Sequence, residues 1–203
     1  QVYKFGCSAF ASLREAEVHD ALKISEIDAV LVSLGRFRDD YDVVNSASGA
    51  ITELSHDLES SRSEIESKGG MKLLLELIKG FNNSKLIAPS NLVSALSNLC
   101  THRDVSSPSI DKSVWRSAFN EVTRTVFLAS HSSQVLTLSC CASFLMQASG
   151  CKGILTVDSE EAERALFGLR TALRARGHLE SNLPAIIAES IMNVASLDGL
   201  SEE

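Results

Sequence analysis

The chain has 203 residues, of which 44% are hydrophobic and only 5% aromatic, and its net charge is −7. The apolar fraction excludes wholesale disorder. No stretch approaches the roughly 18 uncharged apolar residues that a membrane-spanning helix needs. The acidic excess is spread over both halves of the chain, which does not suit a general nucleic-acid binder, because such proteins need a basic footprint.

Helical periodicity begins at the first residues. Val2, Phe5, Ala9 and Leu13 recur at helical spacing, so the chain starts inside a predicted helix. No initiator methionine and no signal-peptide pattern is present there. We therefore expect a piece of a longer chain or a mature form, whose targeting segment could lie outside this sequence.

Two amphipathic helices are predicted toward the end of the first half of the chain. One covers residues 71–81 and the other is centred on 92–99, because apolar side chains recur in both at i, i+3, i+4 and i+7. The "NNS" at 82–84 supplies a break, with Ser84 as a candidate N-cap. Pro89 then falls in the tolerant first turn of the second helix.

Further helices follow the same pattern. "IDAVLVSLGRF" at 27–37 aligns without a gap on "MKLLLELIKGF" at 71–81. Residues 112–129 and 159–175 are also predicted to be helical, and Trp115 occupies a core position in the first of them. Asp158 and Glu161 have the spacing of a capping box at the start of the second.

A small residue followed by apolar residues recurs at steps of 41 to 48 residues. These anchor positions are Ala9, Ala50, Ala95, Ala142 and Ser190. Helices that cross closely need a missing side chain at the contact. The pattern therefore predicts stacked helical units, each of which mainly contacts the next.

The stretch "SRSEIESKGGMKLLLELIKGFNNSKLIAPSNLVSALSNLC" resembles an armadillo repeat, with a short first helix that ends in "KGG". "EVHDALKISEIDAVLVSLGRFRDDYDVVNSASGAITEL" resembles a second copy, with Glu26 where the family often has Gly. Later units keep the spacing without the "GG" and could equally be HEAT-like pairs. The resemblance implies an all-α, right-handed α-solenoid over residues 1–203. Its predicted units are 1–13 (partial), 17–54, 61–100, 105–149 and 152–197.

In the armadillo family the third helices line a concave groove, where Asn side chains grip an extended peptide. The positions that resemble this ladder, or lie one turn before it, form our groove row: Glu53, Ser94, Asn98, Glu189 and Asn193. The tryptophans that characterise nuclear-import adaptors are missing from these helices. Asn98 and Asn193 could instead bond neighbouring turns.

A second candidate surface is a basic strip on two helices: Lys112, Arg116, Arg124, Arg170 and Arg174. Its ordinary interpretation is a solvated helix face, since surface helices place charge opposite the core. Its functional interpretation is a site for an acidic peptide or RNA.

Catalytic signatures are missing from the sequence. It has no phosphate-binding loop, no dinucleotide fingerprint, no HExxH, no CxxC pair and no GxSxG elbow. We therefore expect no enzyme activity, no metal site and no cofactor. The five cysteines are odd in number and irregularly spaced, which predicts thiols in a reducing intracellular compartment.

These observations predict a non-enzymatic protein–protein interaction scaffold or a structural subunit of a larger complex. The partner would be an extended or helical protein segment in the groove, with nucleic acid less favoured and no membrane span. The cytoplasm is the favoured compartment. The alternative is an organellar RNA-binding helical-repeat protein, for example of a mitochondrial ribosome or RNA-processing complex.

Overall fold

The computed structural model describes residues 23–56, 59–101, 112–130, 132, 134–150, 159–176 and 182–197. This part of the chain is all-helical and contains no β-strand. Its helices are α2 (Lys23–Arg36), α3 (Tyr41–His56), α4 (Glu59–Ser67), α5 (Gly70–Asn83), α6 (Ser90–Thr101), α7 (Lys112–Ala129), α8 (Val135–Gly150), α9 (Ser159–Arg176) and α10 (Leu183–Leu197). The first predicted helix, with anchor Ala9, lies outside the described residues.

The described residues group into two compact units. Unit 1 takes those within Gln1–Leu77 and Pro89–His102, and unit 2 takes those within Ile78–Ala88 and Arg103–Glu203. Helices α2, α3, α4 and α6 belong to unit 1, helices α7 to α10 belong to unit 2, and α5 is divided between the units. Each unit is described below by itself.

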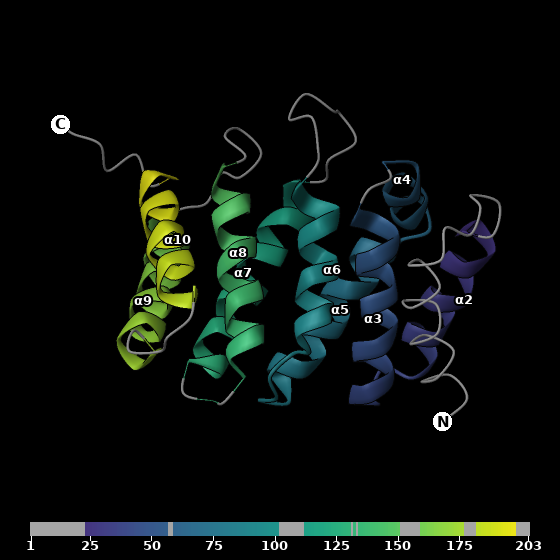
Figure 1. The fold of residues 1–203 in the computed structure, drawn as a ribbon, viewed down its shortest axis with the longest axis horizontal. Helices are drawn as coiled ribbons and strands as arrows, with labels where there is room; N and C mark the ends of the chain where they lie inside the picture. Colours follow the sequence, from purple (N-terminus) through teal and green to yellow (C-terminus); the bar gives the residue numbers. More distant parts are fainter. Residues whose placement is uncertain are drawn as a thin grey trace. The chain divides into compact units, whose positions relative to one another are not determined.

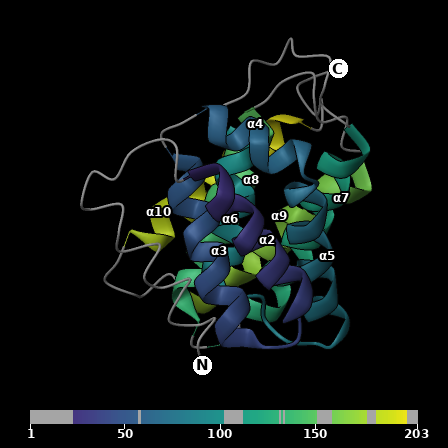
Figure 2. The ribbon, with the colours of Figure 1, turned by 90° about the vertical axis from the view of Figure 1, so that its right-hand side faces the viewer.

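Unit 1 is built around the pairing of α3 with α6, which lie side by side in Figure 1. Figure 2 shows α2 against the other side of α3. The anchors Ala50 on α3 and Ala95 on α6 are 1% and 0% exposed. Large apolar side chains such as Ile51 and Leu96 are fully buried beside them, so the predicted anchors belong to the core of this unit.

Unit 2 contains two further pairs of helices that are distant in sequence. Helix α8 packs against α10, and α7 packs against α9. Trp115 is 1% exposed, which confirms its predicted place in the core. At the other pair, the anchor Ser190 donates its hydroxyl to the carbonyl of the anchor Ala142 at 2.7 Å. Only small side chains at both anchors permit such a close crossing.

The α4–α5 turn depends on the two glycines of the "KGG" stretch. Gly69 adopts a φ of +76°, which favours glycine. A Cβ on Gly70 would lie 2.4 Å from the Ile65 side chain and 2.7 Å from the Ile65 carbonyl oxygen. The two glycines therefore allow α5 to begin directly against the end of α4.

The predicted start of the next helix is wrong. Helix α6 begins at Ser90, so Ser84 is not its N-cap. Lys85 has a positive φ of 56°, and the chain stays non-helical through Pro89. The Pro89 carbonyl accepts from the amides of Leu92 and Val93, so this proline precedes the helix instead of occupying its first turn. The predicted helices over 112–129 and 159–175 agree with α7 and α9.

Candidate functional site

The groove row divides between the two units. In unit 1, Glu53 is exposed on α3, whereas Ser94 and Asn98 are half-buried on α6. The Asn98 side-chain amide donates to the carbonyl of Thr52 at 3.1 Å. One of the two amide hydrogens that could grip a peptide backbone is thus already bonded to a helix of the same unit.

A second amide of α6 makes the same contact two turns earlier. Asn91 donates from Nδ2 to the carbonyl of Asn45 at 3.1 Å. A Cβ on Gly49 would lie 3.0 Å from that nitrogen, so a glycine gives the amide room. Because Asn91–Asn45 and Asn98–Thr52 both advance by seven residues, α3 and α6 run parallel. Sequence reasoning missed Asn91, although its spacing of seven from Asn98 places both on one helix face.

In unit 2 the groove row consists of Glu189 and Asn193 on α10. Glu189 is exposed and Asn193 is half-buried. The buried Ser190, whose hydroxyl bonds α8, lies between them in sequence. The row therefore follows helices whose other faces pack on a partner helix of the same unit, and its exposed members are carboxylates.

The basic strip is largely neutralised where it crosses α7. Arg116 forms an ion pair with Glu161 on α9, with Nε 2.7 Å from Oε1. Asn120 donates to the same oxygen at 2.7 Å. The Glu161 side chain is only 8% exposed, against 47% for Arg116. Arg116 thus balances a buried carboxylate, as a buried charge requires.

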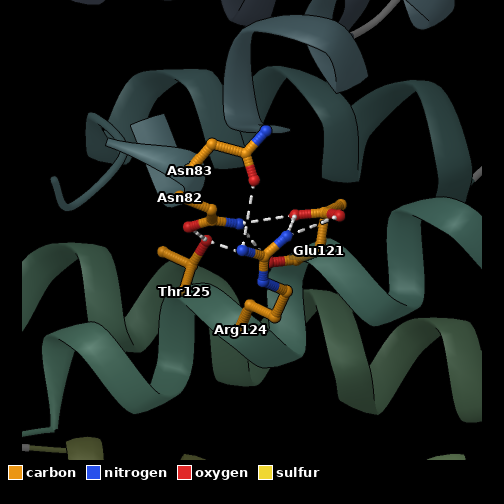
Figure 3. A network of polar contacts seen from close by, with 5 residues as sticks. All are labelled: Asn82, Asn83, Glu121, Arg124 and Thr125. Carbon is orange, nitrogen blue, oxygen red and sulfur yellow. Dashed lines mark hydrogen bonds and ion pairs between the residues drawn. The ribbon is translucent and has the colours of Figure 1, made fainter. Parts of the chain in front are cut away.

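Arg124 takes part in a second polar network, between α5 and α7 (Figure 3). Its guanidinium lies 3.1 Å from both carboxylate oxygens of Glu121 and donates to Asn83 Oδ1 at 3.2 Å. Asn82 donates from Nδ2 to the Glu121 carboxylate and carbonyl, both at 2.9 Å. Thr125 completes the network by donating to Asn82 Oδ1 at 3.1 Å.

The remainder of the strip lies on α9. Arg170 and Arg174 are both exposed, and neither has an acidic partner among the described residues. Arg164 on the same helix forms an ion pair with Glu160. The side chain of Lys112 lies outside what the structure describes. Among the strip residues whose side chains the structure describes, Arg170 and Arg174 are therefore the cations that the fold does not use.

Helix α8 carries two adjacent cysteines, Cys140 and the buried Cys141, neither of which is in a disulfide. Burial, with a smaller contribution from the neighbouring Cys140, raises the pKa of the Cys141 thiol well above its ordinary value. A thiol that resists ionisation is a poor nucleophile and a poor metal ligand. Within the described residues, no group of three or more His, Cys, Asp or Glu side chains could hold a metal ion.

Among the helices that the structure describes, none combines the length and the apolar character needed to cross a membrane. No family model matches this chain, and no curated protein is significantly similar to it.

Proposed function

We propose that the chain is a right-handed α-solenoid of armadillo- or HEAT-like repeats that acts as a non-enzymatic interaction scaffold or a subunit of a larger assembly. The observation that carries the proposal is the recurring parallel packing of helices about one repeat apart. Asn98 meets Thr52 across α3 and α6 at a separation of 46 residues, and Ser190 meets Ala142 across α10 and α8 at 48. Stacked repeats produce such pairings, because each helix packs on its equivalent in the next unit.

The proposed partner is a protein segment, extended or helical, that lies along the groove row. Glu53 and Glu189 are exposed carboxylates on the helices that carry the anchors. Their charge favours a basic or neutral segment over an acidic one. Since the Asn98 donor already serves α3, we assign less of the affinity to that amide than to the exposed carboxylates.

The organellar RNA-binding alternative has weaker support. This alternative depends on the four arginines of the basic strip. Two of them, Arg116 and Arg124, pair with the largely buried Glu161 and Glu121. RNA affinity depends on cations that neutralise phosphates. A strip in which two arginines already pair with carboxylates has little positive charge left to bind RNA. We therefore retain the protein-binding scaffold as the function, in a reducing intracellular compartment that suits Cys140 and Cys141, neither of which is in a disulfide.

Site-specific photocrosslinking in cells would test this proposal. A photoreactive residue is placed at Glu53 or Glu189, both exposed on anchor helices. Glu76 on α5 and Ser113 on α7 are exposed control positions on other helices. We expect one discrete protein adduct from the positions of Glu53 and Glu189. The control positions should not form this adduct. The same adduct from all four positions, or protein adducts from the controls alone, would contradict the proposal.

A further inference from the structure

An exposed aromatic side chain on α9 is held in place by its neighbours. The Phe167 side chain is 63% exposed. Among the large hydrophobic side chains described in helices α7 to α9, only that of Leu136 is more exposed, at 66%. Its ring stacks on Phe127 of α7, with centroids 5.9 Å apart and planes inclined by 30°. Leaving so large an apolar ring in water is costly, so its exposure calls for an explanation.

Gly168 helps to hold this stack. A Cβ at that position would lie 3.3 Å and 3.4 Å from two ring atoms of Phe127. The missing side chain therefore lets the Phe127 ring lie close to the backbone of α9. The exposed Phe167 ring stacks on Phe127, which restricts its motion. Phe167 would therefore lose little conformational entropy when a partner binds it.

The two unused arginines continue from this ring along one face of α9. Arg170 and Arg174 lie three and seven residues after Phe167, which places all three on one helical stripe. All three are exposed. We call Phe167, Arg170 and Arg174 the aromatic–arginine stripe. Glu163, four residues before Phe167, is exposed at its opposite end, so the positive charge is concentrated toward the end of the helix.

We propose that the aromatic–arginine stripe is a second docking surface, which binds an acidic protein segment with one large apolar side chain. Charge complementarity selects the occupant, because the arginines would pair with carboxylates while the apolar side chain covers Phe167. Two arginines suit a short segment with two carboxylates, whereas a long polyanion such as RNA needs many more cations to neutralise its phosphates. This surface is separate from the groove row and has the opposite charge preference.

Helix geometry specifies the spacing of the segment. The two arginines are about 4.5 Å and about 10.5 Å beyond Phe167 along the helix axis, at about 1.5 Å per residue. An extended peptide advances about 3.3 Å per residue. Because side chains on one face of an extended peptide recur every two residues, a matching segment carries carboxylates about two and about four residues from its apolar side chain, within reach of the long arginine side chains.

The probe is a panel of short fluorescent peptides with one Trp or Leu and two Asp at every spacing from one to four residues, in both orders. Fluorescence anisotropy with the full chain gives the Kd. We expect the spacing of two and four to bind best, and Asp→Asn peptides to bind at least about tenfold more weakly. Affinity should fall as salt is raised, since the pairs are exposed.

Three variants separate the stripe from the rest of the helix. Phe167→Ala and the double variant Arg170→Ala/Arg174→Ala should each raise the Kd by about tenfold or more. Arg164→Ala is the matched control, because Arg164 is an exposed arginine of α9 that pairs with Glu160. It should change the Kd by less than about twofold. Melting curves would show that every variant is folded, as expected for exposed positions.

Several outcomes would overturn the proposal. It fails if no peptide of the panel binds, or if Arg164→Ala weakens binding as much as the double variant does. It also fails if oligouridylate binds more tightly than every acidic peptide and loses affinity in the double variant, since the stripe would then be a nucleic-acid surface. None of these results bears on crosslinking at Glu53 and Glu189, so the scaffold proposal is tested independently.

Discussion

Two neighbouring asparagines at the end of α5 offer a sharp test of what holds unit 2 together. Asn82 is 3% exposed and Asn83 is exposed, although the two side chains are chemically identical. Both take part in the network with Glu121 and Arg124 (Figure 3). Replacing each by Ala in turn therefore compares one buried and one exposed amide at adjacent positions.

The contacts of each side chain set the expected magnitudes. Asn82→Ala removes two donated bonds and one accepted bond, and one of the donated bonds goes to a carboxylate that is only 11% exposed. Bonds to charged groups contribute about 1.5–3 kcal/mol and neutral bonds about 0.5–1.5 kcal/mol. Arg124 still pairs with the carboxylate and Thr125 still bonds the Glu121 carbonyl, so we expect a loss of about 2–4 kcal/mol.

Asn83→Ala removes one exposed bond from Arg124 at 3.2 Å, which water can replace. We expect it to cost less than about 0.5 kcal/mol. Arg124→Ala should fall between the two, at about 1 kcal/mol or less, because its side chain is half exposed.

Urea unfolding followed by tryptophan fluorescence would measure these differences. Trp115 is the single tryptophan of the chain and is buried in α7, the helix that carries Glu121, so its emission reports on this part of unit 2. The free energy of unfolding follows from the midpoint at unchanged slope. Equal losses for Asn82→Ala and Asn83→Ala, or a larger loss for Arg124→Ala than for Asn82→Ala, would refute the assignment of stability to the buried amide.

Three other predictions concern single positions. Gly70→Ala should cost about 1–3 kcal/mol or more in the free energy of unfolding, because its Cβ would overlap Ile65. Asn98→Ala should lower the free energy of unfolding by about 0.5–1.5 kcal/mol, because it removes the hydrogen bond to the Thr52 carbonyl. A melting temperature identical to that of the wild type would show that this bond does not stabilise the fold and that the amide serves a partner instead. Cys141 should resist iodoacetamide until unfolding. Because folding raises its pKa, the unfolded chain releases this proton first, and stability should fall as pH rises above about 8.5, less steeply in Cys141→Ala.

Helix positions and core anchors were predictable from the sequence because they depend on local periodicity. The limits of α7 and α9 agree with the apolar pattern to within one residue. Ala95 and Ala142 are fully buried, as small residues at recurring steps predict. The end of α5 was harder, because "NNS" is typical of a turn, whereas Asn82 is a buried helical residue bonded to another helix.

Partners across helices could not be predicted from periodicity. The spacing of Arg116 and Arg124 predicts that they share one row of α7, but it does not reveal that Arg116 pairs with Glu161 of α9 and Arg124 with Glu121 of its own helix. That information lies in Glu161, 45 residues away from its partner, and in the burial of Glu121. Neither carboxylate stands out by composition, since both lie in ordinary acidic helical stretches.

The two polar networks of unit 2 repeat one arrangement. Asn82 of α5 donates to Glu121 of α7 across 39 residues, and Asn120 of α7 donates to Glu161 of α9 across 41. Helix α7 thus carries an acceptor for α5 and a donor for α9 at the adjacent positions Glu121 and Asn120.

Apolar faces alone would tolerate a slip of one helix along its neighbour, whereas a slip here would leave a buried carboxylate without its donors. The recurring amide–carboxylate pair therefore fixes the register of α7 against α5 and of α9 against α7. The outward side chains of α9 have no part in these pairs, which leaves Phe167, Arg170 and Arg174 free to serve an interaction outside the fold.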